Sequence, residues 1–295
     1  MKPSKLVYSS LAALMLCLGT WSVQAAHHEE GENKPNGLDA VLDAQTDDAK
    51  ARYQYRNPKE TLEFFGIKPG MKVAEALPGG GWYSKILLPY LGAEGHLLGV
   101  DYAMDMWPHF GGFANEEFME KRKTWAETWT EGAQPWRGDS GATVSAATFG
   151  TIPEDSAGML DAVLFIRALH NLARFEEKGG YLTNAMADAF KALKPGGIVG
   201  IVQHHGAEDR PDEWANGSNG YLKKSFVIST MEAAGFELVA ESDVNSNAKD
   251  QAGEGDVVWR LPPALGGAKD DEELKAKMLA IGESNRMTLK FRKPS

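Results

Sequence analysis

Two acids and a glycine turn form a pattern that suits a nucleoside ligand. Glu75 ends a short apolar run, and a turn of three glycines follows, Gly79, Gly80 and Gly81. A second apolar run then ends on Asp101. Glycines let a ligand approach the backbone closely, and a carboxylate at a strand end can accept hydrogen bonds from both ribose hydroxyls. Because Glu75 would repel a pyrophosphate, the pattern favours a nucleoside that carries a cation over a dinucleotide.

Three histidines follow two later apolar runs and are the candidate bases. His170 comes just after the run 159–167, and His204 and His205 end the run 198–203. Histidine titrates near neutral pH and can remove a proton from a positioned substrate. We predict this catalytic role for His170 and His205, and the alternative for each is a purely structural hydrogen bond. Neighbours on a strand point to opposite faces, so His204 and His205 are badly placed to share an ion, and we predict no metal site.

The elements that must position these residues are strands separated by helices along the whole chain. The continuous apolar run 159–167 is typical of a strand buried on both faces, and residues 181–193 have the spacing of an amphipathic helix. This order predicts an α/β, Rossmann-like, doubly wound and mostly parallel sheet with helices on both faces. Residues 286–292 alternate and predict an antiparallel C-terminal edge strand. Ligands of such sheets bind outside the carboxyl ends of the strands, where all the candidates lie.

Two segments beside the predicted sheet could cover the site. Tyr53, Tyr55 and Arg56 precede the first strand, where a helix could fold over a nucleotide or simply pack. Residues 102–142 hold four of the eight tryptophans. We expect this insertion to form a small aromatic sub-core that caps the sheet edge, with one or two of its residues lining a cleft.

Charge and composition narrow the class of partner. The 295 residues carry a net charge of −10 and are 43% hydrophobic, which is enough for a real core. Proteins that bind the phosphate backbone depend on clustered Lys and Arg, so we expect no nucleic-acid partner and a small-molecule substrate.

The N-terminal residues have the pattern of a signal peptide. Two lysines precede the apolar run 6–19, and the small residues at 23–25 suit cleavage after position 25. The run is shorter than the ~20 residues of a membrane-spanning helix. We therefore predict export to the periplasm with no stable membrane anchor, the alternative being an N-terminal anchor. Cleavage would also remove Cys17, the only cysteine, which suits an oxidising compartment.

The remaining chain divides by composition. Residues 26–46 are polar with glycine and proline, and we predict a flexible tether there. Residues 47–295 are predicted to form a single domain that includes the aromatic-rich insertion 102–142.

Blocks around the candidate residues resemble the class I S-adenosylmethionine-dependent methyltransferases. Those enzymes carry a strand ending in an acid, a glycine turn, and a second strand ending in an acid. A later buried strand is followed by a helix, the sequence LKPGG and another strand. The matching residues here are 73–81, Asp101, 160–172 and 192–201, so the resemblance spans roughly residues 60–243.

More narrowly, the chain is similar to a family of exported, predicted methyltransferases of unknown substrate. The shared motifs are PGGGWY at 78–83, RxLH at 167–170, LKPGG at 193–197, NxNxKD at 245–250 and RMTLxF at 286–291. This resemblance extends to the C-terminal end.

The resemblance implies S-adenosylmethionine as the cofactor and a methyltransferase that acts on an unknown small acceptor. It implies Glu75 near the amino-acid end of the cofactor, the turn from Gly79 to Gly81 beneath it, and Asp101 on the ribose. The chain departs from the usual pattern in two places. Leu77 stands where the turn has its first glycine, and no aspartate clearly ends the third predicted strand, 142–148.

Two other functions stay open at this point. S-adenosylmethionine is made in the cytosol, which is at odds with an exported chain. The fold could therefore serve a non-catalytic or repurposed Rossmann-like ligand-binding protein, or a metal-assisted hydrolase that uses strand-end histidines and acids.

Overall fold

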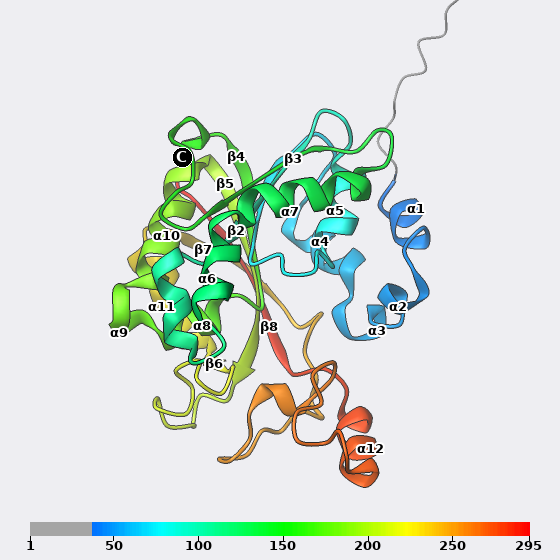
Figure 1. Ribbon diagram of the computed structural model, residues 1–295, viewed down its shortest axis with the longest axis vertical. Coiled ribbons are helices and arrows are strands. Elements are labelled where there is room, and N and C mark those ends of the chain that lie inside the picture. The colour runs from blue at the N-terminus through cyan, green and yellow to red at the C-terminus, as the bar shows by residue number, and fades with distance from the viewer. Residues whose placement is uncertain (1–36) are drawn as a thin grey trace, which may run out of the picture. The chain divides into compact units, whose positions relative to one another are not determined.

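One mixed sheet organises the part of the chain that the computed structural model describes, residues 37–295 (Figure 1). The predicted signal peptide, 1–25, lies outside these residues. The strands are β1 (Lys72–Ala76), β2 (His96–Asp101), β3 (Thr143–Thr148), β4 (Leu160–Ile166), β5 (Leu193–Gly206), β6 (Leu222–Lys223), β7 (Glu237–Ser242) and β8 (Arg286–Arg292). Their order is β3-β2-β1-β4-β5-β8-β7, with β6 paired to β5.

The sheet confirms the predicted α/β class. Pairs along β3-β2-β1-β4-β5 are parallel, whereas β8 runs antiparallel to both β5 and β7. The last strand is thus antiparallel, as predicted, and lies one place in from the edge, which β7 occupies. The carboxyl ends of β1, β4 and β5 consequently lie side by side.

Helices cover both faces of the sheet. The α-helices are α1 (Leu38–Asp43), α2 (Asp47–Lys50), α3 (Tyr53–Arg56), α4 (Pro58–Phe65), α5 (Ser84–Leu91), α6 (Glu116–Lys123), α7 (Trp125–Ala133), α8 (Leu169–Arg174), α9 (Glu176–Gly179), α10 (Tyr181–Ala192), α11 (Lys224–Ala233) and α12 (Glu272–Ile281). Short 3-10 helices are η1 (Met104–Phe110), η2 (Gln134–Arg137), η3 (Glu154–Ser156) and η4 (Val258–Arg260).

Alternation along each strand separates two buried cores. Val73 and Leu164 pack on the face covered by α1, α4, α5 and α7, whereas Ala74 and Phe165 pack on the face covered by α8, α10 and α11. Successive side chains of a strand point to opposite faces, so central strands with apolar residues at every position fill both cores. Each fully buried large apolar side chain contributes roughly 1.5–3 kcal/mol, and these two cores hold the sheet in place.

Helix α1 corrects the prediction of a tether over residues 26–46. Leu38, Val41 and Leu42 are buried against the core that contains α5. Their i, i+3, i+4 spacing forms an apolar stripe that polar neighbours concealed in the composition. The tether prediction is therefore wrong for residues 38–43, and residues 26–36 lie outside the described part of the chain.

The aromatic insertion divides between the two faces. Trp129 packs in the core beside α5, stacked on Trp125 with ring centroids 5.8 Å apart. Trp107 instead joins the opposite core, edge-on to Tyr102 at 5.0 Å. The insertion thus clamps the β2–β3 side of the sheet from both faces and does not form one separate sub-core at the edge.

Within residues 37–295, no helix is both long enough and apolar enough to cross a membrane.

Gly99 in β2 provides a test of the packing of the insertion. A Cβ there would lie 2.6 Å from the Trp129 ring. We expect Gly99→Ala to lower the free energy of unfolding by about 1–3 kcal/mol, because the ring or the strand must shift. In α7, Gly132 has open space around a Cβ, so Gly132→Ala should be neutral or stabilise by about 0.5–1 kcal/mol. Urea unfolding of both variants checks this, and equal effects would contradict the packing.

Candidate functional site

Two strained residues mark the carboxyl ends of the adjacent strands β1 and β4. Leu77 has a φ of 55° and Arg167 a φ of 58°, in the left-handed region that glycine favours. Such strain is of order 1–3 kcal/mol for a residue with a side chain and clusters at ligand sites. Leu77 replaces the first glycine of the expected turn, yet it adopts the conformation that a glycine would take. The turn therefore forms despite this departure from the pattern.

Glu75 is a buried carboxylate whose pKa lies near neutral pH. It is 4% exposed, and the hydroxyl of Ser84 donates a hydrogen bond of 2.5 Å to its Oε2. Burial raises the pKa of Glu75 to about 7, against the opposing effects of this hydrogen bond and of the Arg167 charge. A ligand cation placed beside it would favour the ionised form.

The glycine turn has open space at Gly79 and Gly80 and is covered by a side chain at Gly81. A Cβ would meet no atom within 4 Å at Gly80 and only the Leu77 carbonyl, at 3.9 Å, at Gly79. At Gly81 it would collide with the ring of Trp136. Gly79 and Gly80 are therefore free for a close ligand contact, whereas Gly81 accommodates the insertion.

Asp101 is held by an arginine that the sequence did not single out. Its Oδ2 accepts a hydrogen bond of 2.9 Å from Nη1 of Arg122, whose guanidinium lies 4.1 Å from the ring centroid of Trp107. Burial raises the pKa of Asp101, while the backbone N–H of Tyr102 and the charge of Arg122 lower it. A ribose at Asp101 would have to share the carboxylate with Arg122.

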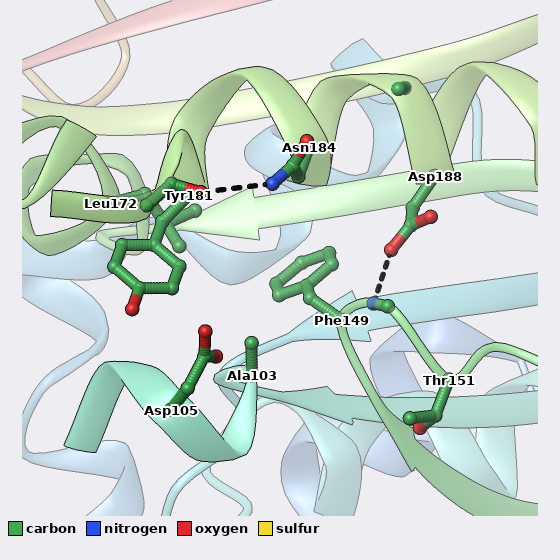
Figure 2. Close-up of a pocket in the computed structure, with 11 residues that line it drawn as sticks. Ala103, Asp105, Phe149, Thr151, Leu172, Tyr181, Asn184 and Asp188 are labelled. Carbon is green, nitrogen blue, oxygen red and sulfur yellow. Dashed lines mark hydrogen bonds between the residues drawn. The ribbon is translucent and has the colours of Figure 1, made fainter. Parts of the chain in front are cut away.

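A cavity of about 450 Å³ opens beside the ends of β2 and β3. Figure 2 shows Asp105 and Tyr181 facing each other across it and Phe149 between them and Asp188. The backbone N–H of Gly150 donates a hydrogen bond of 2.6 Å to Asp188. The volume of the cavity falls in the range of small-molecule sites. Sequence reasoning missed it because its walls come from three separate segments; the polar pair at i, i+4 on α10 was the only local signal.

The structure brings His170 together with His204 and not with His205. The rings of His170 and His204 lie 5.3 Å apart, and Nδ1 of His204 is 2.6 Å from the Ser284 hydroxyl. Nδ1 of His170 is buried and has no hydrogen-bond partner among the described residues. Burial lowers the pKa of both rings, that of His170 to about 4. His205 pairs with Leu222 of β6 and is only half-buried.

Four arginines gather beside this site around one carboxylate. We call them the arginine cluster: Arg52, Arg56, Arg167 and Arg286. Glu283 is 3% exposed, and its carboxylate accepts hydrogen bonds from Nε of Arg56 at 3.2 and 3.3 Å and from Nη1 of Arg286 at 3.2 Å. Nε of Arg52 donates to it at 2.8 Å. Sequence reasoning noted Arg56 and two motifs that begin with Arg167 and Arg286, but it could not show that these residues meet.

Residues 37–295 contain no group of three His, Cys, Asp or Glu side chains placed to hold a metal ion.

Comparisons with known proteins give no family. No family model and no curated protein matches the chain. Among solved structures, the [4+2]-cyclase SpnF is 16% identical, with a TM-score of 0.49 over 81% of this chain and 80% of that one. A putative methyltransferase of Haloferax volcanii, in complex with the Trm112 methyltransferase activator, is 13% identical, with a TM-score of 0.49 over 88% and 99%. A SAM-dependent methyltransferase from Aquifex aeolicus is 16% identical, with a TM-score of 0.44 over 71% and 94%.

Because these scores lie below 0.5, the class of the protein rests on its own strand order. It is a Rossmann-like α/β protein whose candidate site lies at the carboxyl ends of β1, β2, β4 and β5.

The raised pKa of Glu75 predicts a pH-dependent stability. Unfolded Glu has a pKa near 4.5, so between pH 4.5 and 7 the folded state binds a proton that the unfolded state has released. This contribution to stability is therefore lost as the pH rises through that window. Glu75→Gln keeps the shape of the side chain without its charge. We therefore expect the free energy of unfolding of this variant, relative to that of wild type, to be higher at pH 8 than at pH 5 by on the order of 2 kcal/mol.

Urea unfolding at the two pH values measures this difference. Glu63→Gln changes an exposed carboxylate of α4 and is the matched control. The same gain in both variants, or none in Glu75→Gln, would show that Glu75 is not the group responsible.

Proposed function

We propose that the chain is an S-adenosylmethionine-dependent methyltransferase that acts on a small acceptor. The observation that carries this proposal is the presence of two buried carboxylates, Glu75 and Asp101, near the carboxyl ends of the adjacent strands β1 and β2. The left-handed turn that begins at Leu77 lies between them in the chain. In sheets of this kind, ligands bind at this end of the strands.

The residues present fit such a cofactor. Glu75 keeps Oε1 free of its bond to Ser84, so it can pair with a cationic amino-acid end. Gly79 and Gly80 leave room for close approach, and Asp101 supplies acceptor oxygens for ribose hydroxyls. Ala103 and Asp105, which come shortly after Asp101 in the chain, line the cavity beside β2 and β3. We propose that this cavity holds the adenine of the cofactor. When bound, the cofactor would supply an already activated methyl group.

The protein would then align the acceptor and, where needed, take up its proton. We propose His170 as the proton acceptor, because its Nδ1 is buried and has no partner among the described residues. Burial lowers its pKa to about 4, so the ring is neutral at pH 7 but a weak base, suited to a proton that methyl transfer has made strongly acidic. His204 lies against it, and we propose a supporting role for His204, whereas His205, the other predicted catalytic residue, does not contact His170.

A second candidate is a protein that binds a nucleoside without turnover. It is favoured by the ion pair of Asp101 with Arg122 and by the low exposure of His170, 6%. Methyl transfer from labelled S-adenosylmethionine separates the two candidates, because only the first produces S-adenosylhomocysteine.

Binding of S-adenosylhomocysteine tests the proposed site directly. We expect calorimetry on the mature protein to show one site per chain, and Asp101→Asn to weaken it by about tenfold or more, equal to about 1.4 kcal/mol, through loss of charge-assisted ribose contacts. Asp139→Asn changes an exposed aspartate and should bind like wild type. Absence of binding by the wild type at millimolar ligand would overturn the proposal.

We also propose that residues 1–25 direct export, so that the mature protein acts in the periplasm. The basic, apolar and small-residue segments in that order support this. Expressed in a Gram-negative host, the protein should appear in the periplasmic fraction with residue 26 as its N-terminus by mass spectrometry. An intact N-terminus in the membrane fraction would instead support the anchor.

A further inference from the structure

The arginine cluster carries more positive charge than its surroundings neutralise. Arg56, Arg286 and Glu283 are 2%, 3% and 3% exposed. Among residues 37–295, Glu283 is the only carboxylate that forms ion pairs with the cluster, and Glu75 is close enough to Arg167 for each to shift the pKa of the other. Four guanidinium groups against these two carboxylates leave at least two positive charges, because Glu75, with a pKa of about 7, is only partly ionised at neutral pH.

Two donors of the cluster point to a missing acceptor. Nη1 of Arg56 and Nε of Arg167 are buried and have no hydrogen-bond partner among the described residues. A buried charged donor without a partner is destabilising, because it has lost its hydrogen bonds to water without replacement. Burial and the charge of Arg167 lower the pKa of Arg56 to about 9, which agrees with a crowded set of like charges.

The cluster is built into the strand-end site by rigid neighbours. Arg167 follows β4 directly, in the strained backbone conformation, and Arg56 lies 4.5 Å from the ring centroid of Trp82 in the glycine-turn motif. The hydroxyl of Tyr83 donates a hydrogen bond of 3.3 Å to the carbonyl of Arg56. The unpaired donors are thus held beside the carboxyl ends of β1 and β4.

A polar cavity adjoins the other side of the cluster. It has a volume of about 210 Å³, and Glu283 and Arg286 form part of its wall. Asn245, Asn247 and Lys249, three residues of the NxNxKD motif that the proposed function does not use, line it as well. The cavity reaches the cluster at Arg286 and Glu283, and neither Arg56 nor Arg167 lines it.

We propose that the arginine cluster is an oxyanion-binding site that takes a carboxylate or phosphate group of a small ligand. Glu283 orders Arg52, Arg56 and Arg286, and the incoming anion is bound by Arg167 and the free Nη1 of Arg56. Guanidinium groups bind planar carboxylates and phosphates through paired hydrogen bonds. A phosphate with about −1.5 to −2 charges would balance the excess. This site goes beyond the proposed methyl transfer and does not require the cofactor.

Inorganic phosphate is the probe for this site. We expect phosphate, at constant ionic strength set with chloride, to bind the mature protein in calorimetry and to raise its melting temperature. Arg167→Gln should weaken phosphate binding by at least about tenfold. The variant should not melt below wild type, because removing Arg167 relieves its repulsion of Arg56 and leaves the ion pairs of Glu283 intact.

Arg174→Gln is the matched control, since Arg174 is an exposed arginine on α8, seven residues further along. It should bind phosphate like wild type. Failure of wild type to bind phosphate, or equal binding by wild type and Arg167→Gln, would overturn the proposal.

Competition identifies the source of the oxyanion. If S-adenosylhomocysteine displaces phosphate, the site holds the carboxylate of the cofactor's amino-acid end; if both bind together, it holds an acidic group of the acceptor. Either result supports an oxyanion site. Phosphate binding without any binding of S-adenosylhomocysteine would refute the proposed methyltransferase and leave the oxyanion site standing.

Discussion

The carboxylate of Glu283 joins the N-terminal helices to the last strand of the sheet. It accepts hydrogen bonds from Arg52, which precedes α3, from Arg56, the last residue of α3, and from Arg286 at the start of β8. Removing one partner of a buried ion pair typically costs 3–5 kcal/mol, because the other charge is left unpaired. This one side chain therefore fixes how the segment before β1 closes over the carboxyl end of the sheet.

The antiparallel strand gives that interaction its location. Because β8 pairs antiparallel with β5, its first residue, Arg286, lies opposite His204 near the carboxyl end of β5. The loops between β7 and β8 and helix α12 lie at the same end of the sheet, as Figure 1 shows. Residues from both ends of the described chain thus meet where β1 and β4 carry Glu75 and Arg167. The strained backbone at Arg167 is tolerated because the packed strands on either side determine it.

The sequence was sufficient for the sheet and for the acids at its strand ends. Continuous apolar runs such as β4 identify buried parallel strands, and the residue after such a run must lie at the sheet edge where ligands bind. The contacts of those acids were not predictable. Arg122 reaches Asp101 from a helix 21 residues away, and Arg52 bonds Glu283 across 231 residues. Periodicity describes a segment and its own faces, and contains no information on which distant side chain meets it.

The same limit explains why helix α1 was not predicted. Helix α1 was assigned to a tether because its three apolar residues are diluted by polar neighbours, and average composition weighs all of them equally. The limit also holds at the end of β5, where strand alternation allows only one of His204 and His205 to face His170, and the structure places His204 there. Choosing between them requires knowing which face of β5 meets α8, and this depends on the packing of the sheet.

The charges of the site argue for a ligand of mixed charge. Glu75, with a pKa of about 7, and Arg167, with an unpaired Nε, lie at the ends of adjacent strands and shift one another's pKa. A neutral ligand would leave the arginine unpaired in a site of low dielectric, where an unmet charge is most costly. A ligand with a cation near Glu75 and an oxyanion near Arg167 would satisfy both groups at once. We therefore expect the proposed site to prefer separated opposite charges, which could belong to one molecule or to two ligands bound together.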